Sequence, residues 1–464
     1  MEPISVSEIL RATGGRLLDR FDGEETVAAV DTDSRHIQPG SLFVPLVGEN
    51  FDGHSYIRQA LDAGALGCLT DHALPAAECR ADRFYIRVQD TTLALGALAK
   101  FYREKFDIQV VGVTGSVGKT TTKDMIASVL SQKYRVLKTQ GNYNNNIGVP
   151  KTLFGLTREH QVAVVEMGMN HMGEIDYLTR IVQPDVAIIT NIGDAHIENL
   201  GSRENTLRAK AEIFNGLKPG GVAVLNGDDA LLAKLNGVLI HPITWYGERE
   251  GCAFRCTEIY ETGHDCMRLR AETPAGPLEA TIHCPGRHLL YPALTAAAVG
   301  EGFGLTCAEI ARGIEAFAPT RMRMDIVRCR DGITILNDTY NANPQSMRAA
   351  VDVLANYPGS YRVAVLGDML ELGDLGPALH ESVGQFIGRS GIDCLVTVGE
   401  LGEHIAQGAQ SAGLAEVYAR PNKEEAKVVL EQVIRPGAVF LCKASRGMKF
   451  EELVEFLRRL AGSV

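Results

Sequence analysis

The chain has 464 residues, 45% of them hydrophobic and 22% charged, so it is long enough for about three domains and too apolar to be disordered. Its 46 basic and 57 acidic side chains give a net charge of −11, which argues against nucleic acid or an anionic membrane surface as the main partner. No apolar stretch reaches the roughly 20 residues of a membrane helix, since even 289–299 is short and contains Pro292.

The first 15 residues predict a helix rather than a signal peptide, because they lack a basic region followed by an apolar one. Ser5 and Glu8 fit a capping box, and the pair of glycines at 14 and 15 ends the pattern. Residues 1–105 continue with short strands and turns, and with helical patterns at 55–63 and 92–102. We therefore expect a small α/β domain at this end of the chain.

From residue 106 to 316 short apolar runs alternate with helix-length segments, which predicts βαβ units and a parallel sheet. The expected strands are 108–113, 163–168, 185–193 and 221–227, with a helix at 119–132. Between 252 and 283 the alternation favours hairpins, so a small antiparallel patch is expected there. A second α/β series occupies 317–464, with expected strands 333–338, 361–369, 393–399 and 438–444. The fold class predicted is α/β in three domains, without a strand order.

The cysteines favour a reduced protein. Four of them and two nearby histidines match no standard zinc spacing: Cys252, Cys256, Cys266, Cys284, His264 and His283. Buried free thiols are the better interpretation of these cysteines. We expect a cytoplasmic protein, monomeric by default.

The strongest local motif is GVTGSVGKTTTKDM at 112–125, which follows an apolar strand and opens a helix. Glycines there let backbone N–H groups surround phosphate oxygens, and the helix N-terminus adds a favourable dipole. Lys119 is expected to reach the β- and γ-phosphates of ATP or GTP, and Thr120 to place its hydroxyl on Mg²⁺. Val113 stands where the strict motif has glycine. The residues assigned to the loop are Thr114, Gly115, Ser116, Val117, Gly118, Lys119 and Thr120.

Three further residues are candidates for the same site. Glu166 ends an apolar strand and suits Mg²⁺, although it could instead cap the next helix. By their local context alone, His196 is equally a core histidine, and Lys210 is most simply a surface lysine. Asn144, Asn145 and Asn146 lie in a polar loop, where they either bind substrate or make turns, and Asn145 and Asn146 are the two assigned to substrate.

A series of segments occurs in this order: DSRHIQPGSLFVPLVGENFDGH, TGSVGKTTT, GNYNNNIGVP, EMGMNHMGEI, TNIGDAHIENLGS, AKAEIF, PGRHLLYPALTAAAVG, RMRMD, NDTYNANPQSM, LGDMLELG and KASRGMKFEEL. On these segments the chain resembles, along its whole length, the Mur ligase family of ATP-dependent amide ligases of peptidoglycan synthesis. NDTYNANPQSM and LGDMLELG are most similar to the members that add D-alanyl-D-alanine.

The resemblance implies three domains: a UDP-substrate-binding domain at 1–105, an ATP-binding P-loop domain at 106–316, and a Rossmann-like ligase domain at 317–464. It implies UDP-N-acetylmuramoyl-tripeptide, D-alanyl-D-alanine and ATP as substrates, joined through an acyl phosphate. Nucleic acid and membrane insertion are not implied.

The resemblance also implies residue roles. Thr120 and Glu166 resemble ligands of the Mg²⁺ that bridges the ATP phosphates, His196 resembles a ligand of a second Mg²⁺, and Lys210 resembles a carbamylated lysine. The expected catalytic residues are Lys119, Glu166, His196 and Lys210. Further nucleotide-binding residues are His288, Arg323 and Asp338. The residues that resemble the UDP-binding part are Ser34, Arg35, Asp52, Gly53 and His54.

One motif departs from the family. Where the family has two asparagines, GRHLLYPALTAA has Leu289 and Pro292. We expect this loss to affect contacts on the adenine side and to leave the phosphate chemistry unchanged.

Three alternatives stay open at this point. The chain could be another ligase of the same superfamily, adding a different amino acid or acting as a folylpolyglutamate synthase does. It could be a P-loop switch that hydrolyses nucleotide without forming a bond, or a nucleotide kinase. The C-terminal motifs argue against the last two.

Overall fold

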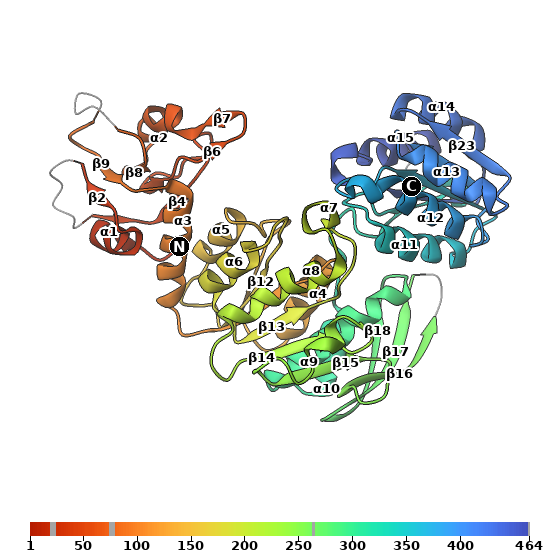
Figure 1. Ribbon diagram of the computed structural model, residues 1–464, viewed down its shortest axis with the longest axis horizontal. Coiled ribbons are helices and arrows are strands. Elements are labelled where there is room, and N and C mark those ends of the chain that lie inside the picture. Colours follow the sequence, from red (N-terminus) through yellow and green to blue (C-terminus); the bar gives the residue numbers. More distant parts are fainter. Residues whose placement is uncertain (19–24, 74–78, 262–264, 463–464) are drawn as a thin grey trace.

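The computed structural model describes residues 1–18, 25–73, 79–261 and 265–462, and it has three α/β lobes that follow one another along the chain (Figure 1). The N-terminal and C-terminal lobes stand at opposite ends of the central lobe, which joins them (Figure 1). No helix among the described residues has the length and apolar character needed to cross a membrane.

The N-terminal lobe is built on a five-stranded sheet of order β2-β9-β8-β5-β4. Its elements are β1 (Ile4–Ser5), α1 (Val6–Thr13), β2 (Arg16–Leu17), β3 (Thr26–Val27), β4 (Ala29–Asp31), β5 (Ser41–Phe43), β6 (Val47–Gly48), β7 (Phe51–Asp52), η1 (Gly53–Tyr56), α2 (Ile57–Asp62), β8 (Gly67–Thr70), β9 (Phe84–Arg87) and α3 (Thr91–Glu104). The capping box of Ser5 and Glu8 is present, and Gly14 ends α1 in a left-handed conformation, as predicted.

The central lobe contains a nine-stranded sheet of order β11-β12-β10-β13-β14-β15-β16-β17-β18. Its first elements are β10 (Gln109–Thr114), α4 (Lys119–Leu130), β11 (Val136–Lys138), α5 (Gly148–Phe154), β12 (Val162–Glu166), α6 (Glu174–Val182), β13 (Val186–Ile189), α7 (Ile197–Leu200), α8 (Arg203–Ala211), η3 (Glu212–Gly216) and β14 (Val222–Asn226). The others are η4 (Leu232–Leu235), β15 (Ile243–Gly247), β16 (Phe254–Glu261), β17 (Met267–Thr273), β18 (Gly276–Ile282), η5 (Arg287–Leu289), α9 (Leu290–Gly302) and α10 (Cys307–Glu315).

The strands from β11 to β16 in this order pair in parallel, whereas β16, β17 and β18 form an antiparallel meander. The predicted antiparallel patch is therefore present, but it extends the same sheet. Within it Cys256 and Cys284 are buried free thiols, and Cys252 and Cys266 are half-buried. His264, named with them in the zinc alternative, lies outside the described residues.

The C-terminal lobe contains a six-stranded sheet of order β19-β20-β24-β21-β22-β23, parallel except for the edge pair β19 and β20. Its elements are β19 (Asp325–Arg328), η6 (Arg330–Gly332), β20 (Thr334–Asn337), α11 (Pro344–Asn356), β21 (Tyr361–Gly367), η7 (Gly373–Leu375), α12 (Gly376–Ile387), β22 (Cys394–Val398), α13 (Gly402–Ser411), β23 (Glu416–Arg420), α14 (Lys423–Val433), β24 (Ala438–Lys443), η8 (Arg446–Met448) and α15 (Glu451–Ala461). Strands β15, β19 and β23 were not expected from the sequence, because their residues are mostly half-buried and give a weaker apolar run.

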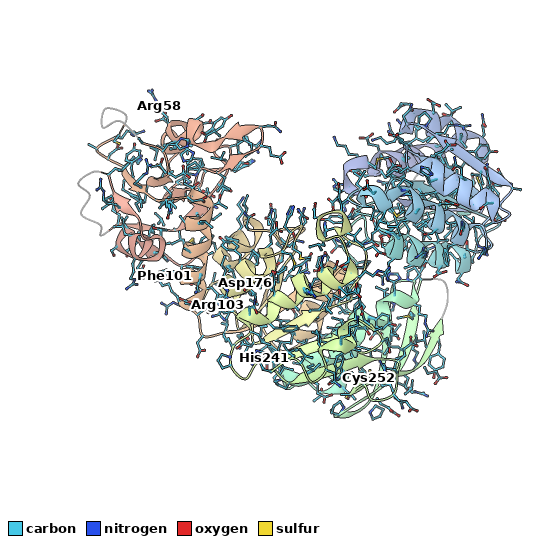
Figure 2. The ribbon with its side chains drawn as sticks, viewed as in Figure 1. Arg58, Phe101, Arg103, Asp176, His241 and Cys252 are labelled. Carbon is cyan, nitrogen blue, oxygen red and sulfur yellow. The ribbon has the colours of Figure 1, made fainter. Side chains whose placement is uncertain are left out.

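Helix α3 ties the N-terminal lobe to the central lobe. Its residues belong to an apolar core that continues into the central sheet. The Tyr102 hydroxyl donates to the Leu156 carbonyl oxygen at 2.6 Å. Arg103, which Figure 2 labels where the two lobes meet, is buried and donates through Nε to the Val182 carbonyl oxygen at 3.0 Å. Buried groups with satisfied hydrogen bonds make this a fixed junction rather than a loose linker.

Candidate active site

The predicted phosphate loop connects β10 to α4 in the middle of the central sheet. Gly115 and Gly118 have φ angles of 147° and 82°, a region that favours glycine. A Cβ at Gly115 would lie 1.8 Å from the Thr190 hydroxyl oxygen, so no other residue fits there. Thr114, at the base of the loop, is fully buried.

The segment after β13 holds this loop in place through hydrogen bonds. The Ser116 and Val117 N–H groups donate to the backbone and side-chain oxygens of Asn191, each at 3.0 Å. The Thr190 hydroxyl and the Asn191 amide both donate to the Val117 carbonyl oxygen. The loop is thus held in shape, while the first N–H groups of α4 have no partner within their helix and face the carboxyl edge of the sheet, as in anion sites at helix N-termini.

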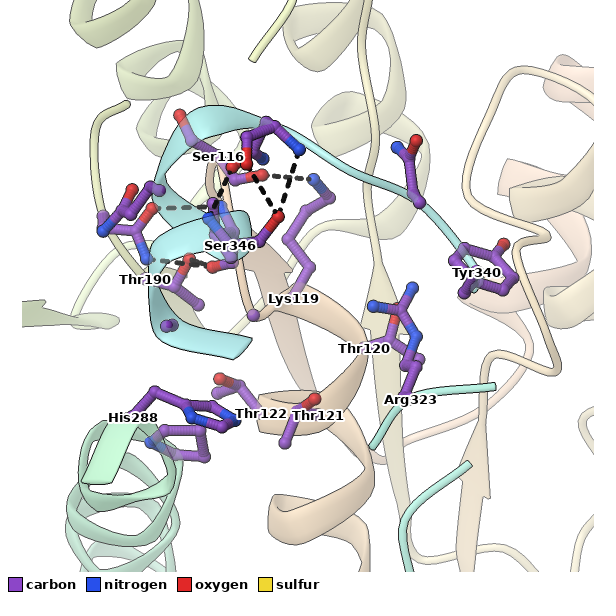
Figure 3. Close-up of a pocket in the computed structure, with 18 of the residues that line it drawn as sticks. Ser116, Lys119, Thr120, Thr121, Thr122, Thr190, His288, Arg323, Tyr340 and Ser346 are labelled. Carbon is purple, nitrogen blue, oxygen red and sulfur yellow. Dashed lines mark hydrogen bonds between the residues drawn. The ribbon is translucent and has the colours of Figure 1, made fainter. Parts of the chain in front are cut away.

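Lys119 folds back over the loop (Figure 3). Its Nζ donates to the Gly115 carbonyl oxygen at 2.8 Å. Burial lowers the pKa of this amine; Glu166 opposes that shift and Arg323 adds to it. Carbonyl oxygens are weak partners for an ammonium group compared with phosphate, so the side chain is placed to exchange them for an anionic ligand.

Glu166 lies beside the start of the loop because β12 pairs in parallel with β10, with Glu166 opposite Val113. The residue is 1% exposed, and its Oε1 accepts a hydrogen bond from the Asn144 amide at 2.8 Å. Its Oε2 is buried without a hydrogen bond among the described residues, and Lys123 Nζ lies 3.9 Å away. A buried, incompletely partnered carboxylate oxygen is a suitable ligand for a hard cation.

His196 connects the central lobe to the C-terminal lobe. Its Nδ1 lies 2.7 Å from Oε2 of Glu371, and this contact lowers the pKa of the Glu371 carboxyl. Both residues have left-handed backbones, with φ angles of 59° and 64°. Such conformations are uncommon for residues other than glycine and mark positions that the surrounding structure holds.

Lys210 lies on α8 and is 1% exposed, so the sequence-based interpretation as a surface lysine is wrong. Burial, followed by repulsion from Lys119, lowers the pKa of its amine well below the ordinary value. Within the described ranges no carboxylate forms an ion pair with it. A buried lysine without an anionic partner is unusual and calls for a chemical reason.

Two residues of the C-terminal part of the chain reach the same place. The Arg323 guanidinium stacks over the Tyr340 ring at 4.1 Å and donates to the Thr120 hydroxyl at 2.9 Å (Figure 3). Asp338 follows β20, and its Oδ2 lies 2.5 Å from the Nζ of buried Lys443.

A cavity of about 440 Å³ lies between the central and C-terminal lobes. It brings together these predicted residues: Ser116, Val117, Gly118, Lys119, Thr120, Glu166, His196, His288, Arg323 and Asp338. Leu289 and Pro292, the two departures from the family motif, also line it. Burial lowers the pKa of His288 and so favours the neutral form of its imidazole. Thr114, Gly115 and Lys210 lie outside the lining.

The predicted substrate residues of the N-terminal lobe do not line this cavity. Arg35 is exposed and paired with Asp33, whose carboxyl pKa it lowers. Asp52 accepts a hydrogen bond from the His54 N–H at 2.9 Å and caps η1. Ser34 lies in a turn after β4, and Gly53 is the first residue of η1.

Asn145 and Asn146 are both exposed. Asn145 accepts hydrogen bonds from the N–H groups of Ile147 and Gly148, so it shapes the turn before α5. Asn144, named with them in the same loop but not assigned to substrate, contacts Glu166 and lines the cavity.

Other cavity residues were missed because their partners are distant in sequence. They are Asn191, Tyr340, Asn341, Asn343, Gln345 and Lys443. Lys443 ends the apolar run of β24, and a lysine in that position is the one signal that could have indicated it.

Comparisons with known proteins agree with this arrangement. Residues 26–103 match the Mur ligase family catalytic domain, 113–300 the Mur ligase middle domain, and 322–446 the Mur ligase glutamate ligase domain. A UDP-N-acetylmuramoyl-tripeptide–D-alanyl-D-alanine ligase of Bacillus subtilis is 39% identical over 467 residues, which cover 98% of each chain. The chain belongs to the Mur ligase family.

Other members of the Mur ligase family extend the likeness. The ligase of the same name from Escherichia coli is 36% identical, over 97% of this chain and 99% of its own. A crystal structure of MurF from Acinetobacter baumannii superposes with a TM-score of 0.92 at 35% identity, over 99% of both chains. MurF of Thermotoga maritima in complex with ADP superposes with a TM-score of 0.82 at 27% identity, over 93% of this chain and 97% of that chain. These likenesses confirm the predicted three-domain α/β fold.

Proposed function

We propose that this Mur ligase joins D-alanyl-D-alanine to UDP-N-acetylmuramoyl-tripeptide, with ATP converted to ADP and phosphate. The observation that carries the proposal is the full-length similarity to curated ligases of that name, at 39% and 36% identity. The phosphate loop and the cavity between two lobes supply the place for nucleotide that such a reaction needs.

ATP is the nucleotide assigned to this cavity, as the ADP complex of the Thermotoga maritima relative supports. The phosphates bind at the N-terminus of α4, where Lys119 turns from the Gly115 carbonyl toward the β- and γ-phosphates. Arg323 and Asp338 lie across the cavity, and we assign them to phosphate and ribose. Leu289 and Pro292 offer the base no hydrogen-bonding side chain, so we expect weaker recognition of adenine than two asparagines would provide.

The residues near the phosphate loop fit Mg²⁺. Thr120 offers a hydroxyl and Glu166 a buried carboxylate oxygen without a hydrogen bond among the described residues. Oxygen atoms are the ligands this cation prefers. His196 and a modified Lys210 are the residues we assign to a second ion. Mg²⁺ offsets the negative charge that otherwise keeps a carboxylate away from the phosphates of ATP.

We assign a carbamate to Lys210 because its amine is buried and its pKa is lowered well below the ordinary value. The neutral amine nitrogen forms a bond to the carbon of CO₂ and loses a proton, which yields a carboxylate-like group. Burial disfavours the ammonium form and thus favours the nucleophilic one.

The chemistry has two steps. A carboxylate oxygen of the tripeptide bonds to the γ-phosphorus, and the bond from that phosphorus to the β–γ bridging oxygen breaks, which leaves an acyl phosphate and ADP. The amine of D-alanyl-D-alanine then bonds to the acyl carbon, phosphate leaves with the former carboxylate oxygen, and the amine loses a proton. Catalysis rests mainly on positioning and on electrostatic stabilisation of the phosphates. Closure of the lobes around the cavity keeps water from the acyl phosphate.

We further propose that residues 1–105 bind the UDP part through Ser34, Arg35, Asp52, Gly53 and His54, that 106–316 bind ATP, and that 317–464 complete the ligase site. Cytoplasmic location and a monomeric state stay predictions. The buried unpaired thiols Cys394 and Cys442 support a reducing compartment.

The deciding experiment measures phosphate release with ATP, Mg²⁺, UDP-N-acetylmuramoyl-tripeptide and D-alanyl-D-alanine, omitting each in turn. We expect release to require every component and a pentapeptide mass to appear. Release without the muramyl peptide would favour a nucleotide hydrolase, and release with a different amino acid or with a folate would favour another ligase of the superfamily.

A further inference from the structure

Lys123 and Asp124 belong to the phosphate-loop motif of the sequence but have no role in the proposed chemistry. Both lie on α4 and both are buried, with 2% and 6% of their surface exposed. Nζ of Lys123 donates to the Thr139 carbonyl oxygen at 2.8 Å and lies 3.3 Å from Oδ1 of Asp124. Nζ of Lys138 donates to the same Oδ1 at 2.7 Å. Burial alone raises the pKa of the Asp124 carboxyl, but its neighbours, Lys123 first, outweigh burial and lower it, so the group is an anion at neutral pH.

The other carboxylate oxygen of Asp124 contacts the linker between the central and C-terminal lobes. This linker, residues 316–324, joins α10 to β19, and the Thr320 hydroxyl donates to Oδ2 of Asp124 at 2.6 Å. In the same turn the Arg323 N–H donates to the Thr320 carbonyl oxygen at 3.1 Å. The Arg323 guanidinium donates to the Thr120 hydroxyl at 2.9 Å (Figure 3). A chain of contacts therefore runs from Asp124 through the linker and back to the start of α4.

The spacing of residues on α4 explains how Asp124 acts on Arg323. Because Thr120 and Asp124 are four residues apart, they lie on the same face of the helix, one turn from each other. Thr320 and Arg323 are three residues apart in the linker, and each contacts one of these two helix residues. The linker is thus attached to the helix face at two points. With the Asp124 contact removed, only the Arg323 contact remains on this face, and the guanidinium is free to turn about Thr120.

The backbone of the linker is held in a shape that it would not adopt freely. Met322 and Met324 have φ angles of 65° and 53°, left-handed values that are uncommon for residues other than glycine. Such conformations persist only where the surrounding contacts hold them. On the side of the C-terminal lobe, the Tyr340 N–H donates to the Met322 carbonyl oxygen at 3.1 Å, and the Met324 N–H donates to Oδ1 of Asp338 at 3.2 Å. On the side of the central lobe, the hydroxyl of Thr320 holds the same turn.

We propose that Asp124 is a positioning residue of the phosphate site, which holds Thr320 and thereby fixes the Arg323 guanidinium over the phosphate loop. Nε of Arg323 is buried without a hydrogen bond among the described residues, so the group has a donor left for an anion. A guanidinium binds phosphate as a planar fork, so its direction matters. A fork that is already aimed loses less freedom on binding, and the contact should therefore increase nucleotide affinity. This inference rests on the proposed nucleotide site and not on the identity of the peptide that is joined.

The experiment measures binding of a non-hydrolysable ATP analogue with Mg²⁺ to the full-length protein by calorimetry, which needs no ligase activity. Thr320→Val removes the hydroxyl, and we expect about 3- to 10-fold weaker binding from the loss of this hydrogen bond to a carboxylate. Thr320→Ser keeps the hydroxyl and should bind as the unmodified protein does. Thr320 is substituted rather than Asp124, because loss of the carboxylate would leave the buried Lys123 ammonium without its nearest anion among the described residues. Thr320 is half-buried, so the valine variant is expected to fold, which circular dichroism checks.

A double-mutant cycle separates positioning from structural support. Arg323→Gln alone should weaken binding of the analogue about 10- to 100-fold, as expected for a charge-assisted contact with phosphate. If Thr320 acts through Arg323, Thr320→Val should cause little further loss in the Arg323→Gln background. Equal losses in both backgrounds, or normal affinity in Thr320→Val alone, would overturn the proposal.

Ser128→Ala is the matched control. Ser128 lies one turn beyond Asp124 on α4, and its hydroxyl donates to the Gly313 carbonyl oxygen of α10 at 2.7 Å, so this contact does not lead to Arg323. The variant should bind the analogue with unchanged affinity. No binding by the unmodified protein would overturn the proposed nucleotide site together with this inference, whereas normal binding by Thr320→Val would overturn the inference alone.

Discussion

At the scale of single residues, the two buried lysines of the central lobe have different surroundings. Lys119 contacts loop carbonyls and is attracted by the Glu166 carboxylate, whereas Lys210 is repelled by Lys119 and forms no ion pair with a carboxylate among the described residues. An ammonium group can stay charged in the first environment. In the second it is costly, so the neutral amine or a modified form is favoured.

Lys119→Ala should lower the rate of the ATP-dependent reaction by about 10²- to 10³-fold, because it removes a donor aimed at charge on the transferred phosphoryl group. Phosphate release with all substrates measures the effect. Lys234→Ala, which removes an exposed lysine of η4, is the control and should keep normal activity. An unchanged rate in Lys119→Ala would contradict its assigned role.

Lys210→Ala should abolish turnover and regain part of it when a small carboxylic acid such as acetate is added, since the acid can occupy the place of a carbamate. Lys119→Ala should not be rescued in this way, because there the missing group is a cation. Full activity of Lys210→Ala without added acid would refute the carbamate assignment.

At the scale of elements, the site is made by strand ends that meet at one edge of a sheet. Glu166 ends β12, and Thr190 and Asn191 follow β13, on either side of the strand that carries the phosphate loop. Parallel pairing brings these ends together although the sequence separates them. In the C-terminal lobe, buried His380 of α12 supports the segment that follows β21. Its Nε2 accepts the Met369 N–H at 2.8 Å, and its Nδ1 donates to the Gly376 carbonyl oxygen at 2.6 Å.

Burial lowers the pKa of His380, which makes the stability of the C-terminal lobe depend on pH. Between the lowered folded-state pKa and the unfolded value of about 6.5, the unfolded chain binds more protons, so the free energy of unfolding falls as pH drops through this window. Above about pH 7, His380 should cause no further change of the free energy of unfolding with pH.

Thermal unfolding from pH 7.5 to 5, values chosen to bracket the ordinary histidine pKa of about 6.5, measures this dependence. His380→Gln should show a shallower decline, whereas His36→Gln, which removes an exposed histidine, should match the unmodified protein. Identical slopes in all three proteins would exclude His380 as the source.

At the scale of the whole molecule, the cavity exists only because the C-terminal lobe rests on the central one. Three contacts join them around the cavity: Arg323 with Thr120, Thr320 with Asp124, and His196 with Glu371. Two of these involve residues that we assign to the magnesium sites. Nucleotide binding must therefore exchange contacts between lobes for contacts with ligand, which couples binding to lobe movement.

Glu371→Gln should loosen the C-terminal lobe without unfolding it. The His196 and Glu371 side chains are 19% and 57% exposed, so this contact is worth about 0–1 kcal/mol and its loss shifts the balance of open and closed forms by up to about fivefold. Small-angle X-ray scattering of the nucleotide-free protein should show a larger radius of gyration. Asp374→Asn, an exposed neighbour in η7, controls for the change of charge. An equal radius of gyration in Glu371→Gln and Asp374→Asn would show that this contact does not hold the two lobes together.

Features that neighbouring residues create could be predicted from the amino-acid order alone. The phosphate loop, the capping box at Ser5 and the main strands are of this kind, because their geometry depends on local spacing and on glycines. The strand order, the burial of Lys210 and the pairing of Asp338 with Lys443, 105 residues later, emerged from the three-dimensional fold. Such contacts depend on which strand ends share an edge and which lobes meet, and no periodicity along the chain records that. The ligand roles of His196 and Lys210 came from the family resemblance and stay predictions.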